Sequence, residues 1–273
     1  MNFEIPSVNQ KQGILHSVKS RLATLLASQV QGTKAGSGDA KRGVASAAPS
    51  ALAAQVEVFS NLMETALQIA RHDVRGLASL VSAILRPLQF EQILSVAERE
   101  QHAAREAIRF EQLFSSDYFF SYFDPNDCIR LTAGDYEVDL ARDIVLTTPW
   151  VRNGFASALA HIGEGKKSGH WQQDPNHSVM LVLPWRIAVV TGGNHSIAAG
   201  ILSHEGSVVP SDVLDLTPVL ARVFCDGRRF LCRTSGKAVA HVRDGRMGAL
   251  FEIGRLMTQM SSRQSGSPAP TLE

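Results

Sequence analysis

The stretch that most constrains the fold of this chain is Trp185 to Gly206, which combines a strand pattern, a glycine pair and a helix pattern. Ile187 to Thr191 is a short apolar and β-branched run, and Asn194 to Glu205 then changes to helical spacing. We therefore predict a strand, a tight turn and a helix. The first backbone N–H groups of such a helix have no partners within the helix and lie at the positive end of its dipole, so the turn is suited to bind an anion.

The five residues of the turn resemble a known phosphate-binding motif. Gly192-Gly193-Asn194-His195-Ser196 is similar to the G-G-C-H-R turn of sulfiredoxins and to the G-x-H-R and G-E-R-R turns of ParB-type domains. In that superfamily the turn binds the phosphates of ATP, CTP or a nucleic acid, and some members are nucleases. On this basis the chain resembles the ParB/sulfiredoxin-like superfamily and is expected to belong to an uncharacterised bacterial family within it.

The resemblance covers Val138 to Gly206 and departs from the family pattern at two positions of the turn. Asn194 stands where sulfiredoxins have their catalytic cysteine, so repair chemistry that needs a thiolate nucleophile is not expected. Ser196 stands where the usual arginine binds a phosphate with two hydrogen bonds, and its hydroxyl can equally cap a helix. Despite these two differences, the turn is still expected to bind a nucleotide.

The resemblance implies a role for each turn residue. Gly192, Gly193 and Asn194 are expected to offer backbone contacts to a phosphate. His195 is expected to bind phosphate or to act as the catalytic acid or base, and Ser196 to donate a hydrogen bond. The implied cofactor is a nucleotide, ATP or CTP, and the implied chemistry is phosphotransfer or nuclease activity. Whether a reaction is catalysed stays open.

Two lysines complete the predicted site. Lys166 and Lys167 lie in a polar, glycine-rich loop and suit a phosphate, although such pairs are also common on plain surfaces.

An alternative function does not involve a ligand at this turn. In it, the glycine pair is only a tight turn, Asn194 or Ser196 caps the helix, and the protein is a non-catalytic interaction or scaffold protein. A docking arm would then be its amphipathic N-terminal helix, Gly13 to Val30.

The predicted fold class is α+β, with an N-terminal helical region, a small mixed sheet of the ParB/sulfiredoxin type, and a C-terminal antiparallel meander and helix. The predicted segments are an amphipathic helix and flexible linker (1–49), a helical region (50–136), a mixed domain (137–262) and a disordered tail (263–273).

Local patterns predict the individual elements within these segments. The expected helices begin at Ser50 and cover 74–85, closed by Pro87, then 90–114, 151–162 and 247–260. The expected strands cover 144–150, 179–183, 219–225, 228–233 and 237–242.

Charge is distributed unevenly along the 273 residues, although the net charge is only +1. Residues 1–50 hold six Lys and Arg against two Asp and Glu, whereas residues 51–150 hold eight against fifteen. A nucleic acid is therefore expected to contact only the basic N-terminal tail or the C-terminal third. No signal sequence or long apolar run is present, which predicts a cytoplasmic protein that does not bind a membrane.

Cysteine and histidine patterns argue against a disulfide framework and a metal site. The three cysteines are odd in number and lack C-x-x-C spacing. His170, His177 and His195 lie in loops without a spaced acidic partner, so no metal is predicted.

Overall fold

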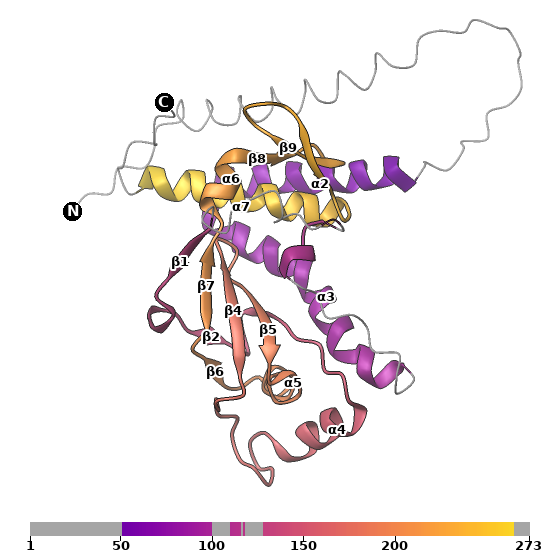
Figure 1. Cartoon of the computed structure of the whole chain (residues 1–273), viewed down its shortest axis with the longest axis vertical. Coiled ribbons are helices and arrows are strands. Elements are labelled where there is room, and N and C mark those ends of the chain that lie inside the picture. Colours follow the sequence, from indigo (N-terminus) through magenta and orange to yellow (C-terminus); the bar gives the residue numbers. More distant parts are fainter. Residues whose placement is uncertain (1–50, 100–109, 116, 118–127, 265–273) are drawn as a thin grey trace, which may run out of the picture.

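The α+β class is confirmed by a computed structural model that describes residues 51–99, 110–115, 117 and 128–264. Helices come first, a mixed sheet follows, and a three-stranded sheet and a long helix end the chain (Figure 1). The predicted N-terminal helix, Gly13 to Val30, and the predicted linker before Ala51 lie outside the described residues. None of the described helices is long and apolar enough to cross a membrane.

Helices and strands are named here as in Figure 1. The helices are α2 (Ala51–His72), α3 (Leu77–Glu98), α4 (Arg152–His161), α5 (Asn194–Ser203), α6 (Thr217–Arg222) and α7 (Gly245–Gln264), with the 3₁₀ turns η2 (Val74–Gly76), η3 (Phe110–Gln112) and η6 (Ala133–Asp135). The strands are β1 (Ile129–Leu131), β2 (Val138–Asp139), β3 (Ile144–Leu146), β4 (Ser178–Leu183), β5 (Ile187–Gly192), β6 (Ser207–Val208), β7 (Asp212–Asp215), β8 (Val223–Cys225), β9 (Arg229–Cys232) and β10 (Ala238–His241).

The main sheet has five strands in the order β1-β7-β4-β5-β3. β3 runs parallel to β5, with Ile144 opposite Ile187, and β4 runs parallel to β7; the other two pairings are antiparallel. The carboxyl ends of β3 and β5 therefore meet at one edge of the sheet, where ligands of open α/β sheets commonly bind.

Both faces of the main sheet are buried, which explains the continuous apolar run of β5. Ile187 and Val189 belong to a core cluster shared with α2, α3 and α7, whereas Ala188 and Val190 belong to a second cluster under α4 and α5. In Figure 1, α2 and α7 lie side by side beyond one end of the sheet, and α5 lies near the opposite end of β5.

The first core cluster continues across the predicted boundary between 50–136 and 137–262. It combines Phe59 of α2 and Leu85 of α3 with Phe251 of α7. Strand β1 also lies before the boundary but pairs with β7, with Ile129 opposite Asp215. The boundary stays a prediction, and the residues on its two sides share one core.

Three predicted helix boundaries before residue 115 are wrong. α3 runs through Pro87 from Leu77 to Glu98, so Pro87 does not end a helix and no new helix begins at Phe90. Burial of the inner side of α3, including Leu85, outweighs the hydrogen bond that an internal proline removes. The helix expected to begin at residue 74 begins at Leu77 instead, because residues 74–76 form η2, which Asp73 caps by accepting the Arg75 N–H at 2.9 Å.

Four predictions about strands also need correction. Residues 217–222 form α6, not a strand, and the strand expected to reach Trp150 ends at Leu146. No strand was predicted between residues 206 and 219, where Asp212–Asp215 forms strand β7. The strand expected over 228–233 begins at Arg229, and Cys225 lies opposite Phe230, because the two-residue turn consists of Gly227 and Arg228 between the bonded residues Asp226 and Arg229.

Candidate functional site

The predicted strand, turn and helix are present at β5 and α5. Gly193 is the N-terminal cap of α5 and has φ +77°, and its carbonyl accepts the N–H of Ile197 at 3.0 Å. A Cβ atom at Gly193 would lie 2.3 Å from Cδ2 of His177. The absence of a side chain is therefore required both by the left-handed backbone and by the packing of an internal histidine.

A chain of hydrogen bonds links this histidine to the turn. The backbone N–H of Asp174 donates to Nδ1 of His177 at 2.7 Å, so the proton of the neutral ring lies on Nε2. Nε2 then donates to Oγ of Ser196 at 2.5 Å, and that hydroxyl donates to the Gly193 carbonyl at 3.1 Å. Burial lowers the pKa of His177, which favours the neutral ring that this chain requires.

A buried indole covers the same side of the turn. The ring of Trp171 lies 4.8 Å from the ring of His177, and its Nε1 donates to the Ser196 carbonyl at 2.7 Å. Trp171 is only 5% exposed, so its indole closes this side of the turn. The hydroxyl of Ser196 accepts from His177 and donates to the Gly193 carbonyl, so both of its roles are used within the protein.

Asn194 joins the two loops that follow the parallel strands. Its Oδ1 accepts hydrogen bonds from Oγ1 of Thr147 and from the backbone N–H of Thr148, both at 2.9 Å. Both threonines are buried and follow β3 directly. The side chain that replaces the sulfiredoxin cysteine thus fixes the loop after β3 to the start of α5.

His195 connects α5 to the start of α4. Its Nε2 accepts the backbone N–H of Val151 at 3.1 Å, so the proton of the neutral ring lies on Nδ1. Burial lowers the pKa of His195 and favours that neutral form. The ring of Trp150 lies 5.7 Å from the imidazole, and this indole is 62% exposed.

The structure does not bring the predicted lysines to the glycine turn. Nζ of Lys166 donates to the Leu159 carbonyl at 2.8 Å, near the C-terminal end of α4. Gly163 of the same loop packs against Ser203, the last residue of α5. Because ten helical residues span about 15 Å, the loop of Lys166 and Lys167 lies at the other end of α5.

The residues that surround the turn were largely missed by sequence reasoning. Thr147, Thr148 and Trp171 carry no local signal, and His177 was considered only as a metal ligand. The Asp-Pro-Asn turn before His177 was a usable signal, because the His177 N–H bonds the Asp174 carbonyl there. Among the described residues, no group of three or more His, Cys, Asp or Glu side chains is placed to hold a metal ion.

Acidification is expected to destabilise the protein partly through His177. Its pKa in the folded state lies below the ordinary value of 6.5, so the unfolded chain binds the proton more readily. Stability from this group is therefore present above the unfolded pKa and is lost as the pH falls below it. When the pH is lowered from about 7.5 to about 5.5, the free energy of unfolding measured in urea should fall less for His177→Gln than for wild type.

An exposed residue without a titratable group provides the control for this experiment. Gln173 is exposed and carries no titratable side chain, so Gln173→Ala should keep the wild-type dependence on pH. An unchanged pH dependence in His177→Gln would contradict the assignment of a buried neutral ring.

Comparison with known proteins gives one match. A family model described as a family of unknown function (DUF6710) matches residues 32–264. No curated protein and no solved structure matches the chain.

Proposed function

Because the chain belongs to the DUF6710 family, whose function is unknown, we propose its function from the geometry of the site: the start of α5 binds the phosphate of a nucleotide. The observation that carries the proposal is Trp150, whose indole is 62% exposed and lies beside His195 at this helix end. The ATP or CTP expected from the ParB/sulfiredoxin resemblance is the ligand class that fits a phosphate site next to an exposed aromatic ring.

The phosphate contacts in this proposal come from the backbone. The N–H groups of Asn194, His195 and Ser196 precede the first intrahelical donor of α5, Ile197. Such groups lie at the N-terminal end of the helix, where its dipole favours an anion. The bonded side chains of Asn194 and Ser196 hold this end in place, so they act here as positioning groups.

His195 has a narrower role in this proposal than the resemblance implied. Its Nε2 lone pair is engaged with the Val151 N–H, and its remaining donor is Nδ1–H. A neutral imidazole of this kind can donate to a phosphate oxygen, whereas a general base would first have to release Val151. We therefore propose binding as the function; phosphotransfer and nuclease activity stay predictions.

The nucleobase contact is assigned to Trp150. An exposed indole stacks on any base, and such contacts contribute about 1–3 kcal/mol per base. A phosphate at α5 and a base on Trp150 would together explain why this aromatic side chain stays in solvent. We expect the protein to act in the cytoplasm, and contact of a nucleic acid with its basic N-terminal tail or C-terminal third stays a prediction.

Calorimetric titration of the full chain with ATP, CTP and inorganic phosphate tests the proposal. We expect Trp150→Ala to weaken nucleotide binding by about 1–3 kcal/mol, because the stacking surface is lost, and to leave phosphate binding unchanged. Lys167→Ala is the matched surface control and should change neither affinity, because its loop lies at the far end of α5. The absence of binding to all three ligands, or equal nucleotide affinities of Trp150→Ala and wild type, would contradict the proposal.

The scaffold function has its own supporting observation, which does not involve the glycine turn. α3 carries an exposed apolar side, with Leu94 50% exposed. Such a surface is typical of a site for another helix.

A further inference from the structure

Helix α3 is apolar on two opposite sides, and only one of them is buried. Leu77, Val81 and Leu85 of the inner side belong to the main core. The outer side, here called the outer stripe, has exposed residues at helical spacing: Ala83, Pro87, Phe90, Leu94 and Ala97. Phe90 and Leu94 are 37% and 50% exposed. These exposures show that no described residue covers the outer stripe. A helix that is apolar all round is normally covered on all sides, so the stripe is suited to bind a partner.

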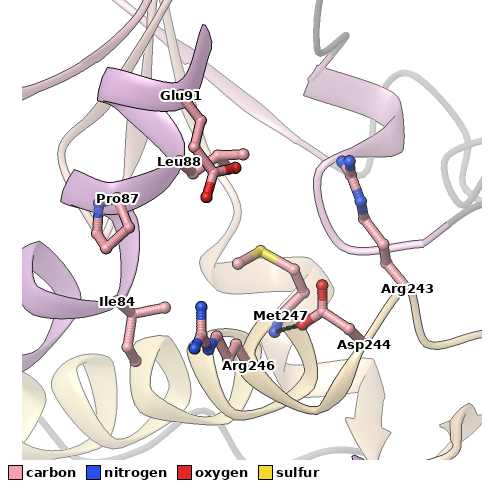
Figure 2. A pocket seen from close by; sticks show the side chains of 8 residues that line it. All are labelled: Ile84, Pro87, Leu88, Glu91, Arg243, Asp244, Arg246 and Met247. Carbon is pink, nitrogen blue, oxygen red and sulfur yellow. Dashed lines mark hydrogen bonds between the residues drawn. The ribbon is translucent and has the colours of Figure 1, made fainter.

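A pocket opens beside the outer stripe (Figure 2). Its volume is about 160 Å³, and its lining comes from Ile84, Pro87, Leu88 and Glu91 of α3 and from Arg243, Asp244, Arg246 and Met247 at the start of α7. Figure 2 shows Ile84, Pro87 and Leu88 along one wall, with Met247 across from them. A volume of this size holds a molecule as large as benzene, so the apolar half of the lining, Ile84, Pro87, Leu88 and Met247, leaves room for one aliphatic side chain, with the four charged residues around it.

We propose that the N-terminal segment Gly13 to Val30 docks as an amphipathic helix on the outer stripe and places one leucine in the pocket. The proposal is independent of the phosphate site. The apolar residues of the segment recur at helical spacing: Ile14, Leu15, Val18, Leu22, Leu25 and Leu26. Eighteen helical residues span about 27 Å, which fits along the 33 Å or so of α3.

Charge favours this segment over a second copy of the chain. Glu91 and Glu98 are exposed next to the outer stripe, and α3 holds these two acids against one base, Arg86. Residues 1–50 hold six Lys and Arg against two acids, and Lys19 and Arg21 flank the apolar side of the segment. The basic segment therefore complements the net charge of α3, whereas two copies facing each other through α3 would bring together two helices of the same net charge.

The connection keeps the segment near the described part of the chain. Twenty residues, 31–50, separate the segment from Ala51, the first residue of α2. A glycine- and serine-rich connection of that length has an average end-to-end distance of about 25 Å and a maximum of about 65 Å. Such a tether holds the segment at an effective concentration of about millimolar near the stripe, so a weak contact is sufficient for docking.

Thiol labelling of the full chain tests the contact. A cysteine is placed in the stripe by Leu94→Cys, in a chain that also carries Cys128→Ser and Cys232→Ser; Cys225 is buried and is kept. Leu22→Asp should disrupt docking and accelerate maleimide labelling of Leu94→Cys about tenfold, as expected for a site that is covered about 90% of the time. Ser20→Asp adds the same charge on the opposite side of the segment and should leave the rate unchanged.

A second reporter and the molecular mass separate the alternatives. Val209→Cys replaces a residue that is 48% exposed outside the stripe, and its labelling rate should be equal in all chains. Equal rates of Leu94→Cys in the Leu22→Asp and Ser20→Asp chains would overturn the proposal. Slow labelling that depends on protein concentration and accompanies a doubled mass would also overturn it, because a second copy would then cover the stripe.

Discussion

Gly193→Ala is expected to destabilise the protein by about 2–5 kcal/mol. A residue with a side chain in the left-handed region costs about 1–2 kcal/mol, and overpacking costs about 1–3 kcal/mol. Both costs apply because Gly193 has φ +77° and its new Cβ atom would lie 2.3 Å from Cδ2 of the buried His177. Urea unfolding followed by circular dichroism measures the change.

Two further variants separate the two costs. Gly236 has φ +67°, but no atom lies within 4 Å of a Cβ placed there, so Gly236→Ala should cost only the backbone part, about 1–2 kcal/mol. In a His177→Ala background the contact with the ring is removed and only the 3.2 Å contact with Cα of residue 177 stays, so Gly193→Ala should cost less than in wild type and approach the cost of Gly236→Ala. If Gly193→Ala costs the same with and without the His177 ring, the packing explanation is wrong.

The same contact changes how ligand experiments at this turn are read. Because a side chain at Gly193 meets His177 first, weaker phosphate binding by Gly193→Ala would report a disturbed turn as much as a blocked ligand. Trp150 is a better probe, since its indole is exposed and the hydrogen bonds that hold the turn come from other residues.

Trp185→Ala is expected to cost about 3–5 kcal/mol, in the range of large-to-small substitutions in protein cores. The indole is 4% exposed and lies 5.0 Å from the ring of Phe114, and its Nε1 donates to the Leu250 carbonyl at 2.7 Å. Gly254 of α7 lies so close to the ring that a Cβ atom there would be 2.3 Å from Cε2. The substitution therefore leaves a cavity between the sheet and α7.

An exposed residue of the same type provides the control. Trp150→Ala removes the same number of atoms from a side chain that is 62% exposed, so its free energy of unfolding should stay within about 0.5 kcal/mol of wild type. Thermal unfolding compares the two variants directly. A Trp185→Ala chain that unfolds at the same temperature as Trp150→Ala would contradict the central place of Trp185 in the core.

Elements whose signals are local could be identified without the structure. The β-branched run of β5, the glycine pair and the helical spacing of α5 lie within about twenty consecutive residues, and the structure has them in that order. Helix α4 and strand β4 were also predicted to within two residues at each end. Neighbouring residues specify backbone conformation in these segments, so no distant contact was needed to identify them.

The surroundings of the glycine turn, and the exceptions to the local patterns, depend on contacts between distant parts of the chain. His177 and Thr147 reach α5 from separate loops, and no local pattern shows that they bond Ser196 and Asn194. Pro87 stays inside α3 because burial of the helix's inner side outweighs the loss of one backbone hydrogen bond. The short β7 is a strand because β1 and β4 lie on either side of it to accept its backbone hydrogen bonds. In each case the deciding free energy comes from residues far away in the chain, which a local pattern does not contain.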